Sequence, residues 1–338
     1  MYMKNRNINI EILRIISMFM VIILHFLYHG HVLENLKFEI SIYNFLIIFL
    51  ETFSIVAVNI YILISAYYLS QKNVELTKIK KIYLKTFIIS IIIGIILLLL
   101  KQIEFNLKNI ITICLPFTMQ LYWFVNAYLI LLFLSPYINM IIDRFNQNEL
   151  KKILITLLVI NSIIPFISMN TVLLTTGNSV FWFINLYLIA GYIKKYNISL
   201  SLKKNIFFYL LILLLMSCFN LIIYKNFGLL LMLRFLNYNN IWVLILSVLV
   251  FLLFINSKQK YSRNLEKFIM FFSKSTFAVY LISDNKFVRE ILWKNLIDTL
   301  KYNNNIYMII YIILNSILIF LACVICDKII NSFKIFRR

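Results

Sequence analysis

Two polar residues inside the first long apolar segment are the strongest candidates for chemistry. Residues 11–31 have the length and hydropathy of a membrane-spanning helix, yet Arg14 lies near one end and His25 towards the other. His25 follows Arg14 by eleven positions, which at about 100° each come to roughly three turns, so both side chains project from one helix face about 16 Å apart. Such residues in a lipid-embedded helix usually line a protein interior or a watery path. The plainer alternative is that Arg14 snorkels to the headgroups and His25 packs in the core.

The composition around this pair is that of an integral membrane protein. The 338 residues are 62% hydrophobic and 14% charged, with a mean hydropathy of +0.90, whereas soluble domains are less apolar and more highly charged. The net charge of +20 does not indicate nucleic acid, because the basic residues form short clusters between apolar segments. We expect one all-α domain over residues 1–338, a single bundle of about ten transmembrane helices. The expected spans are 9–29, 46–69, 82–101, 119–142, 153–170, 179–193, 206–224, 240–256, 267–283 and 305–326, with a short re-entrant or interfacial helix in 226–239.

The distribution of lysine and arginine predicts the orientation of the bundle. With both termini in the cytoplasm, the inside segments carry 22 of the 33 basic residues and the outside loops carry nine, Arg14 and Lys274 lying within spans. Positive charge collects on the cytoplasmic side of membrane proteins. We therefore expect a multi-pass protein of the plasma (inner) membrane, with Arg14 at the cytoplasmic level and His25 at the outer level.

Several other polar groups are candidates to share a cavity with this pair. Glu51 lies where the second apolar stretch begins, at about the level of His25. A carboxylate there would hold one imidazole nitrogen and leave the other as an acceptor. The alternative is that Glu51 caps a helix or extends to the membrane interface. Asn59 and Asn126 lie inside spans, where amides either connect helices or line a cavity. Trp123 belongs to an aromatic cluster of the kind found at membrane interfaces.

The densest basic cluster lies on the predicted cytoplasmic side. Its members, Lys78, Lys80, Lys81 and Lys85, are either topology determinants alone or a site for a polyanionic cosubstrate. The four cysteines lie in or beside apolar segments, so neither a disulfide framework nor a metal site is expected.

These residues, taken in order along the chain, resemble the acyltransferase-3 family of multi-pass membrane enzymes. Arg14 and His25 match its R-x10-H pattern in the first helix. Further family-like stretches are ETFSIVAVN at 51–59 with LISAY at 63–67, YWFVNAY at 122–128 with LSPYIN at 134–139, FWFINLY at 181–187 with GYI at 191–193, and STFAVYLISDN at 275–285 followed by Arg289 and Trp293. The resemblance thus extends over most of the chain. Within the family, the chain is similar to members that modify surface polysaccharides.

Two positions depart from the family pattern. Ala66 stands where the family usually has the glycine of Ser-Gly-Tyr, a change of one methyl group. Ser283 stands where relatives often have a histidine after Tyr-Leu-Ile. If that histidine handles substrate or protons, its role is absent here or passes to Asp284.

The resemblance implies transfer of an acyl group, usually acetyl, from cytoplasmic acetyl-CoA to a sugar hydroxyl of a lipid-linked or surface glycan. His25 would act as general base or as a transient acyl carrier, with Glu51 beside it, and Arg14 would hold phosphate or polarise the donor carbonyl. Donor binding is assigned to Arg14, Lys78, Lys80 and Lys81, and substrate binding to Asn59, Trp123, Asn126 and Asp284.

Two readings compete with an acyltransferase. A transporter or flippase for a lipid-linked sugar would use the same intramembrane charges as a proton relay. Such proteins commonly have internal repeats with helices broken by glycine or proline, and no such repeat is visible in a chain with 5 glycines and 3 prolines. The other reading is a catalytically inactive membrane partner of the same fold, which the serine at position 283 favours.

Overall fold

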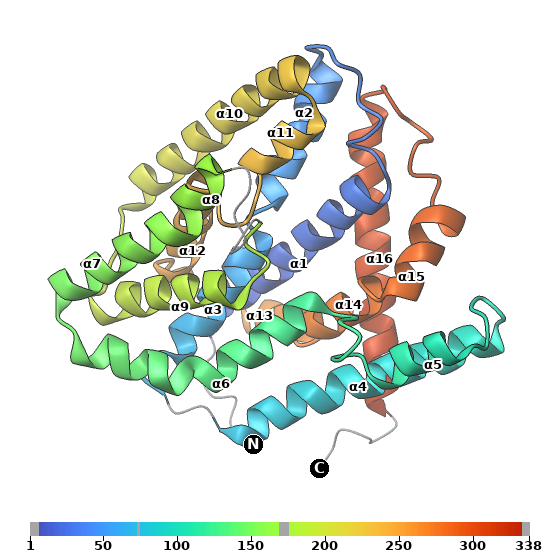
Figure 1. The fold of residues 1–338 in the computed structure, drawn as a ribbon, viewed down its shortest axis with the longest axis horizontal. Coiled ribbons are helices and arrows are strands. Elements are labelled where there is room, and N and C mark those ends of the chain that lie inside the picture. Colours follow the sequence, from blue (N-terminus) through green and yellow to red (C-terminus); the bar gives the residue numbers. More distant parts are fainter. Residues whose placement is uncertain (1–6, 73–74, 169–175, 333–338) are drawn as a thin grey trace.

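The computed structural model describes residues 7–72, 75–168 and 176–332, and every regular element in these ranges is helical. The helices follow one another along the chain as shown in Figure 1. They are α1 (Ile8–His29), α2 (Ile42–Ser54), α3 (Ala57–Leu69), α4 (Leu76–Leu99), α5 (Leu107–Cys114), α6 (Trp123–Arg144), α7 (Gln147–Leu158), η1 (Val159–Ile163), α8 (Ile164–Ile167), α9 (Val180–Lys195), α10 (Leu202–Phe227), α11 (Leu229–Phe235), α12 (Ile241–Ile255), α13 (Arg263–Ser273), α14 (Thr276–Ser283), α15 (Lys286–Glu290), η2 (Ile291–Leu296) and α16 (Tyr307–Ser332). The two elements η1 and η2 are π-helical turns.

The all-helical membrane architecture agrees with the sequence, but the count of ten spans is not confirmed. Within the described ranges, seven helical segments are long and apolar enough to cross a bilayer, with α2 and α3 counted together as Ile42–Leu69. The predicted sixth and eighth spans are the shorter helices α9 and α12, of 16 and 15 residues. The predicted ninth span is two helices, since α13 ends at Ser273 and α14 starts at Thr276. Hydropathy alone does not register such breaks.

Helix α1 runs through the middle of the bundle. It packs against α2, α3, α12, α13, α14 and α16, and Figure 1 shows it crossing the molecule between α3 and α14. Asn7 caps its start, because the side chain accepts a hydrogen bond from the backbone N–H of Asn9 at 3.0 Å, and Gly30 follows its last residue, His29, as the C-cap. Apolar side chains on most of its faces are buried, as expected of a helix surrounded by others. The candidate residues of α1 are therefore held on the most enclosed element of the fold.

The loops separate into two sets that match the predicted alternation across the membrane. At one end of the bundle, segments predicted to be cytoplasmic contact one another: Lys194 Nζ donates to Ser70 O (2.7 Å), Asn139 Nδ2 to Lys72 O (3.0 Å) and Asn9 Nδ2 to Ser257 O (3.0 Å). At the other end, segments predicted to be external do the same: Thr299 Oγ1 donates to Gly30 O (2.8 Å), Tyr224 OH to Leu36 O (2.6 Å) and Tyr43 OH to Asn303 Oδ1 (3.1 Å). Which end faces the cytoplasm remains a prediction from the lysine and arginine distribution.

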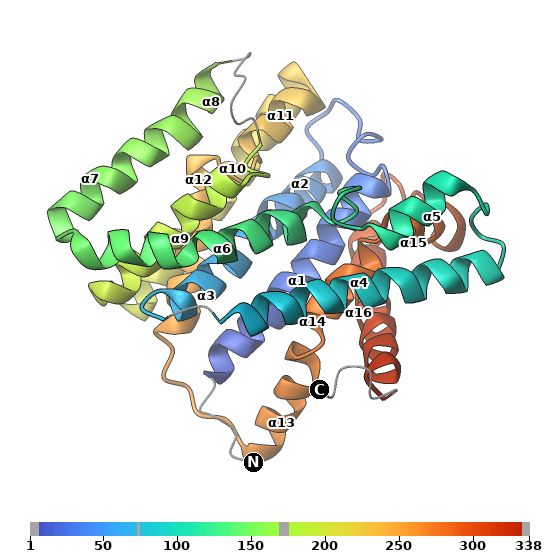
Figure 2. The ribbon, with the colours of Figure 1, turned by 60° about the horizontal axis from the view of Figure 1, so that its bottom comes forward.

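An ion pair joins two long helices near the predicted cytoplasmic end. Lys85 Nζ of α4 lies 3.0 Å from Asp327 Oδ1 of α16, and Asp327 is only 2% exposed. A buried carboxylate without such a partner is strongly destabilising. Figure 2 shows α4 passing across α14, so this pair helps to hold α4 against the C-terminal helices. Lys85 therefore has a structural partner, whereas the described residues include no ion-pair partner for Lys78, Lys80 or Lys81.

Candidate active site

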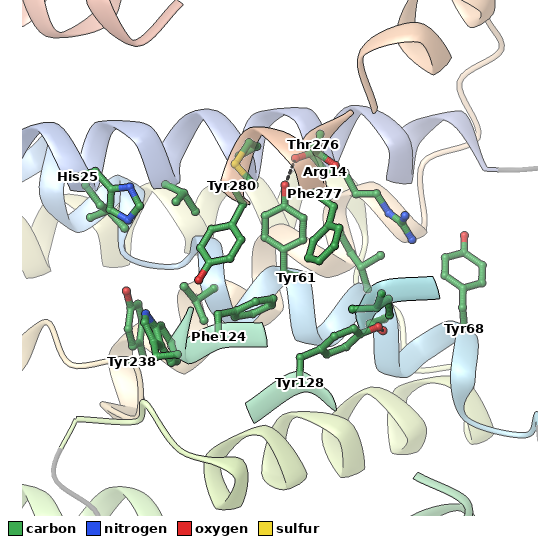
Figure 3. A pocket seen from close by; sticks show the side chains of 18 of the residues that line it. Arg14, His25, Tyr61, Tyr68, Phe124, Tyr128, Tyr238, Thr276, Phe277 and Tyr280 are labelled. Carbon is green, nitrogen blue, oxygen red and sulfur yellow. Dashed lines mark hydrogen bonds between the residues drawn. The ribbon is translucent and has the colours of Figure 1, made fainter. Parts of the chain in front are cut away.

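A cavity of about 330 Å³ follows α1 along the face that carries Arg14 and His25. Five residues of α1 line it at the spacing of one helix face, namely Arg14, Met18, Val21, Leu24 and His25. Figure 3 shows Arg14 and His25 projecting from α1 into the same space, at opposite ends of it. The geometry expected from the eleven-residue spacing is thus present in the fold.

Aromatic side chains form the opposite wall of the cavity. Trp123, Phe124 and Tyr128 come from α6, and the ring of Phe124 stacks on that of Tyr128 with centroids 5.9 Å apart. Trp123 stacks on Tyr238 at 6.0 Å, and both line the cavity. Tyr280 of α14 closes the remaining side near His25 (Figure 3). Rigid, mostly apolar walls with a few polar groups are typical of small-molecule sites.

The Arg14 end of the cavity concentrates positive charge. Tyr61 OH donates to the backbone carbonyl of Arg14 at 2.7 Å, which ties α3 to α1 at this point. The Nε of Arg14 is buried and has no hydrogen-bond partner among the described residues. Lys78 of α4 lines the same cavity. A buried guanidinium donor of this kind, with a second cation beside it, suits an anionic group.

The His25 end contains a carboxylate that comes from a distant part of the sequence. His25 Nε2 lies 3.5 Å from Asp284 Oδ1, and Asp284 is only 3% exposed. The other ring nitrogen, Nδ1, has no hydrogen-bond partner in the described part of the chain. An imidazole with a carboxylate at one nitrogen and the other nitrogen unused has the arrangement of a general base.

Asp284 is held in place by contacts on both sides of it. Tyr122 OH donates to Leu281 O at 2.9 Å and accepts from Asn285 Nδ2 at 2.8 Å. The Asn285 side chain also caps α15 by accepting from Phe287 N at 3.1 Å. The chain between α14 and α15 is therefore anchored to the start of α6, which fixes the position of the carboxylate.

A second histidine and an arginine complete the cluster, and sequence reasoning did not single out either as a site residue. Arg289 Nη1 lies 3.3 Å from Asp284 Oδ1 and 3.0 Å from His29 Nε2. The rings of His25 and His29 have centroids 5.3 Å apart. The available signal was spacing, because His29 is four residues after His25 and so lies on the same helix face.

The cluster has the ligand types of a metal site, but one of its own cations occupies part of the space. Ligand atoms of His25, His29 and Asp284 all lie within 4.8 Å of one another. The guanidinium of Arg289 contacts two of these three groups. A metal ion would have to displace it, so the expectation that no metal is needed stays a prediction.

Comparison with known proteins identifies a family whose sequence model matches the chain. Residues 7–327 match the sequence model of the acyltransferase-3 family, whose description is an acyltransferase domain. The chain belongs to this family. No curated protein and no solved structure matches it. The match covers nearly the whole chain and supports, in general terms, a membrane acyltransferase.

Two predicted groups of this acyltransferase lie away from the cavity lining. Glu51 is 4% exposed within α2, and its Oε2 has no hydrogen-bond partner among the described residues. It is not a lining residue, and Asp284 is the carboxylate found near His25. Lys80 and Lys81 are exposed on α4 and do not line the cavity, whereas Lys78 does.

Asn59 and Asn126 were predicted either to connect helices or to line a cavity, and in the structure both have contacts that connect segments. Asn59 Nδ2 donates to Tyr238 O at 2.9 Å, and Asn59 Oδ1 accepts from Trp182 Nε1 at 2.9 Å. Asn126 Nδ2 donates to Phe117 O at 2.9 Å. Neither asparagine lines the cavity, whereas Trp123 does.

The two departures from the family pattern occupy buried positions. Ala66 is fully buried in α3, and its neighbour Ser65 lines the cavity with a 2.5 Å hydrogen bond to Tyr128 OH. Ser283 is buried, and its hydroxyl has no partner in the described residues. Asp284, the next residue, is the one that reaches His25.

Proposed function

We propose that this acyltransferase moves an acyl group, in the first place acetyl, from cytoplasmic acyl-CoA to a sugar hydroxyl of a cell-surface or lipid-linked glycan. The observation that carries the proposal is one cavity on one face of α1, with Arg14 at one end and the His25–Asp284 pair at the other. The protein would lie in the plasma membrane with the Arg14 end towards the cytoplasm, in line with the distribution of basic residues.

The donor enters from the end that holds Arg14 and Lys78. Acyl-CoA carries phosphates at one end of a slender pantetheine arm and the thioester at the other. The two cations bind phosphate by charge-assisted hydrogen bonds, and the aromatic walls enclose the arm. The Arg14–His25 separation of roughly 16 Å along α1 then brings the thioester towards His25. This placement makes the acetyl-CoA cosubstrate compatible with a cavity of about 330 Å³, because the nucleotide stays outside it.

His25 then acts as general base on the acceptor. It takes the proton of the sugar hydroxyl as the hydroxyl oxygen attacks the thioester carbonyl carbon. The C–S bond breaks, the acyl group remains on the sugar oxygen, and His25 returns the proton to the CoA thiolate. The Asp284 carboxylate stabilises the imidazolium that exists between these steps. Base catalysis of this kind contributes about 10²–10⁴-fold in rate.

The experiment compares His25→Ala with Gln102→Ala in the protein's own cell. Gln102 is an exposed polar residue of a predicted outer loop and lines neither of the two pockets of the structure, so Gln102→Ala is the control. We expect His25→Ala to abolish glycan O-acetylation, measured by mass, while the protein still inserts and accumulates normally. Retained acetylation would contradict the role of His25.

Radiolabelled acetyl-CoA separates the proposal from its rivals. Purified protein should bind it and transfer the label to a glycan fraction. Neither binding nor transfer would favour a transporter or an inactive partner. Label that stays covalently on the wild-type protein and is absent from His25→Ala would make His25 the acyl carrier instead of the base.

A further inference from the structure

A second pocket of about 300 Å³, called the outer pocket below, lies beside the His25 cluster on the side of the predicted outer loops. The cavity along α1 that holds Arg14 and His25 is called the donor cavity. It is formed by the end of α1, by residues that follow it, and by α15 and η2. The residues that matter here are His29, Lys286, Arg289, Glu290 and Lys294. Donor binding at the Arg14 end does not use this pocket.

The charges in the pocket are only partly neutralised within the protein. Arg289 is engaged by Asp284 at 3.3 Å, and Glu34 by His31 Nδ1 at 2.7 Å. Lys286 and Lys294 are exposed and have no ion-pair or hydrogen-bond partner among the described residues. Among the described residues that line the pocket, two ammonium groups without a partner thus accompany one such carboxylate, that of Glu290.

This combination of groups fits one chemical class of ligand. Ammonium groups bind a carboxylate or a phosphate, while a carboxylate accepts hydrogen bonds from sugar hydroxyls. A pocket of this size lies at the small end of ligand sites and suits a sugar-sized group.

The pocket also lies next to the reacting centre. His29 lines the outer pocket and His25 lines the donor cavity, and their rings have centroids only 5.3 Å apart. A hydroxyl held in the outer pocket would reach His25 by passing the His29–Arg289 contact of 3.0 Å.

We infer that the outer pocket is the acceptor subsite and that it selects a saccharide carrying an anionic group, a carboxylate or a phosphate. This inference rests on the proposed function for its role in catalysis. Lys286 and Lys294 bind the anionic group, Glu290 binds hydroxyls, and the reacting hydroxyl points towards His25. The acceptor is therefore an acidic or phosphorylated sugar unit in preference to a neutral one.

The test measures sugar binding without an acyl donor. Purified protein in phosphatidylcholine nanodiscs is titrated with glucose, glucuronic acid and glucose 6-phosphate, which share one ring and differ in charge. Binding is followed by saturation-transfer NMR at low salt. We expect the two charged sugars to bind more tightly than glucose, and Lys286→Gln and Lys294→Gln each to weaken them about fivefold, the value of one good exposed ion pair. Glucose binding should not change in either variant.

The matched control is Lys37→Gln, which removes the same charge from the neighbouring outer loop without altering the pocket. Equal binding of the three sugars, or equal weakening by Lys37→Gln, would overturn the inference. If phosphatidylglycerol nanodiscs abolish the sugar preference through the same two lysines, the lysines hold lipid headgroups and the inference is wrong. Selective sugar binding without any acyl transfer would instead overturn the proposed function and leave the pocket as an anionic-sugar site.

Discussion

The role of Asp284 can be tested by removing its charge without changing its shape. In Asp284→Asn the side chain keeps its volume, while His25 loses the carboxylate that lies 3.5 Å from its Nε2. The imidazolium formed during transfer is then less stable. We expect turnover to fall and the Michaelis constant for the donor to stay near its wild-type value, because Asp284 lies at the far end of the cavity from Arg14.

The size of the loss follows from the distances. Two unit charges at 3.5 Å with an effective dielectric constant of about 20 interact by about 5 kcal/mol. Arg289 lies 3.3 Å from the same carboxylate oxygen and offsets part of its field, so we take half of this value. A barrier increase of about 2.4 kcal/mol corresponds to a turnover about 50-fold slower.

The assay is the initial rate of label transfer from acetyl-CoA to glycan in membranes with matched amounts of protein. Asp298→Asn is the control, since Asp298 is exposed in the same outer segment and lies outside both pockets. Glu51→Gln is measured beside it, because Glu51 is the carboxylate that the sequence suggested for this role. Full turnover in Asp284→Asn, or a larger loss in Glu51→Gln, would refute the assignment of Asp284.

Two further predictions concern the donor site and the stability of the bundle. Arg14→Gln should raise the Michaelis constant for the donor by about 10- to 150-fold, because the loss of one hydrogen bond to a charged group costs about 1.5–3 kcal/mol. The control is Lys81→Gln, which removes a charge at the same end of the bundle but outside the cavity and should leave this constant unchanged. Equal effects of the two variants would contradict the donor site. Lys85→Met should lower the free energy of unfolding by about 3–5 kcal/mol, because Asp327 is left buried without its partner. The loss is measured as a lower thermal unfolding temperature in detergent, and adding Asp327→Leu should restore most of the lost stability. An unchanged unfolding temperature in the single variant would show that the pair contributes nothing.

Much of the fold follows from hydropathy, and the exceptions have physical causes. Each of the ten predicted apolar segments contains a helix in the structure. The count of ten spans is not confirmed, because hydropathy does not register a helix break, such as the one between α13 and α14, or the limited length of α9 and α12. Helix α5 was not expected, since its eight residues form a segment too short to stand out.

Of the site residues, those on one helix could be placed from the sequence, and those from distant segments could not. Arg14 and His25 are eleven residues apart on one helix, so helical geometry alone places them on one face. Asp284 and Arg289 reach the same cluster from more than 250 residues away, and their approach depends on how α14 packs against α1. Periodicity carries no information about such packing. Glu51 was chosen by its level in the membrane, and level does not specify which side of a helix faces the cavity.

In the proposed reaction, the position of the cluster would let one helix serve two substrates that enter from opposite sides. His25 belongs to the donor cavity and His29, one turn later, to the outer pocket. Because side chains four residues apart lie on one face, a lining residue of each pocket lies within a single turn of α1, with ring centroids 5.3 Å apart. Asp284 contacts His25, Arg289 contacts His29, and Asp284 and Arg289 contact each other. In the proposed reaction, an acyl group that arrives along α1 would therefore travel no further than His25 to meet a hydroxyl from the other side, and the acyl group alone would cross the bilayer.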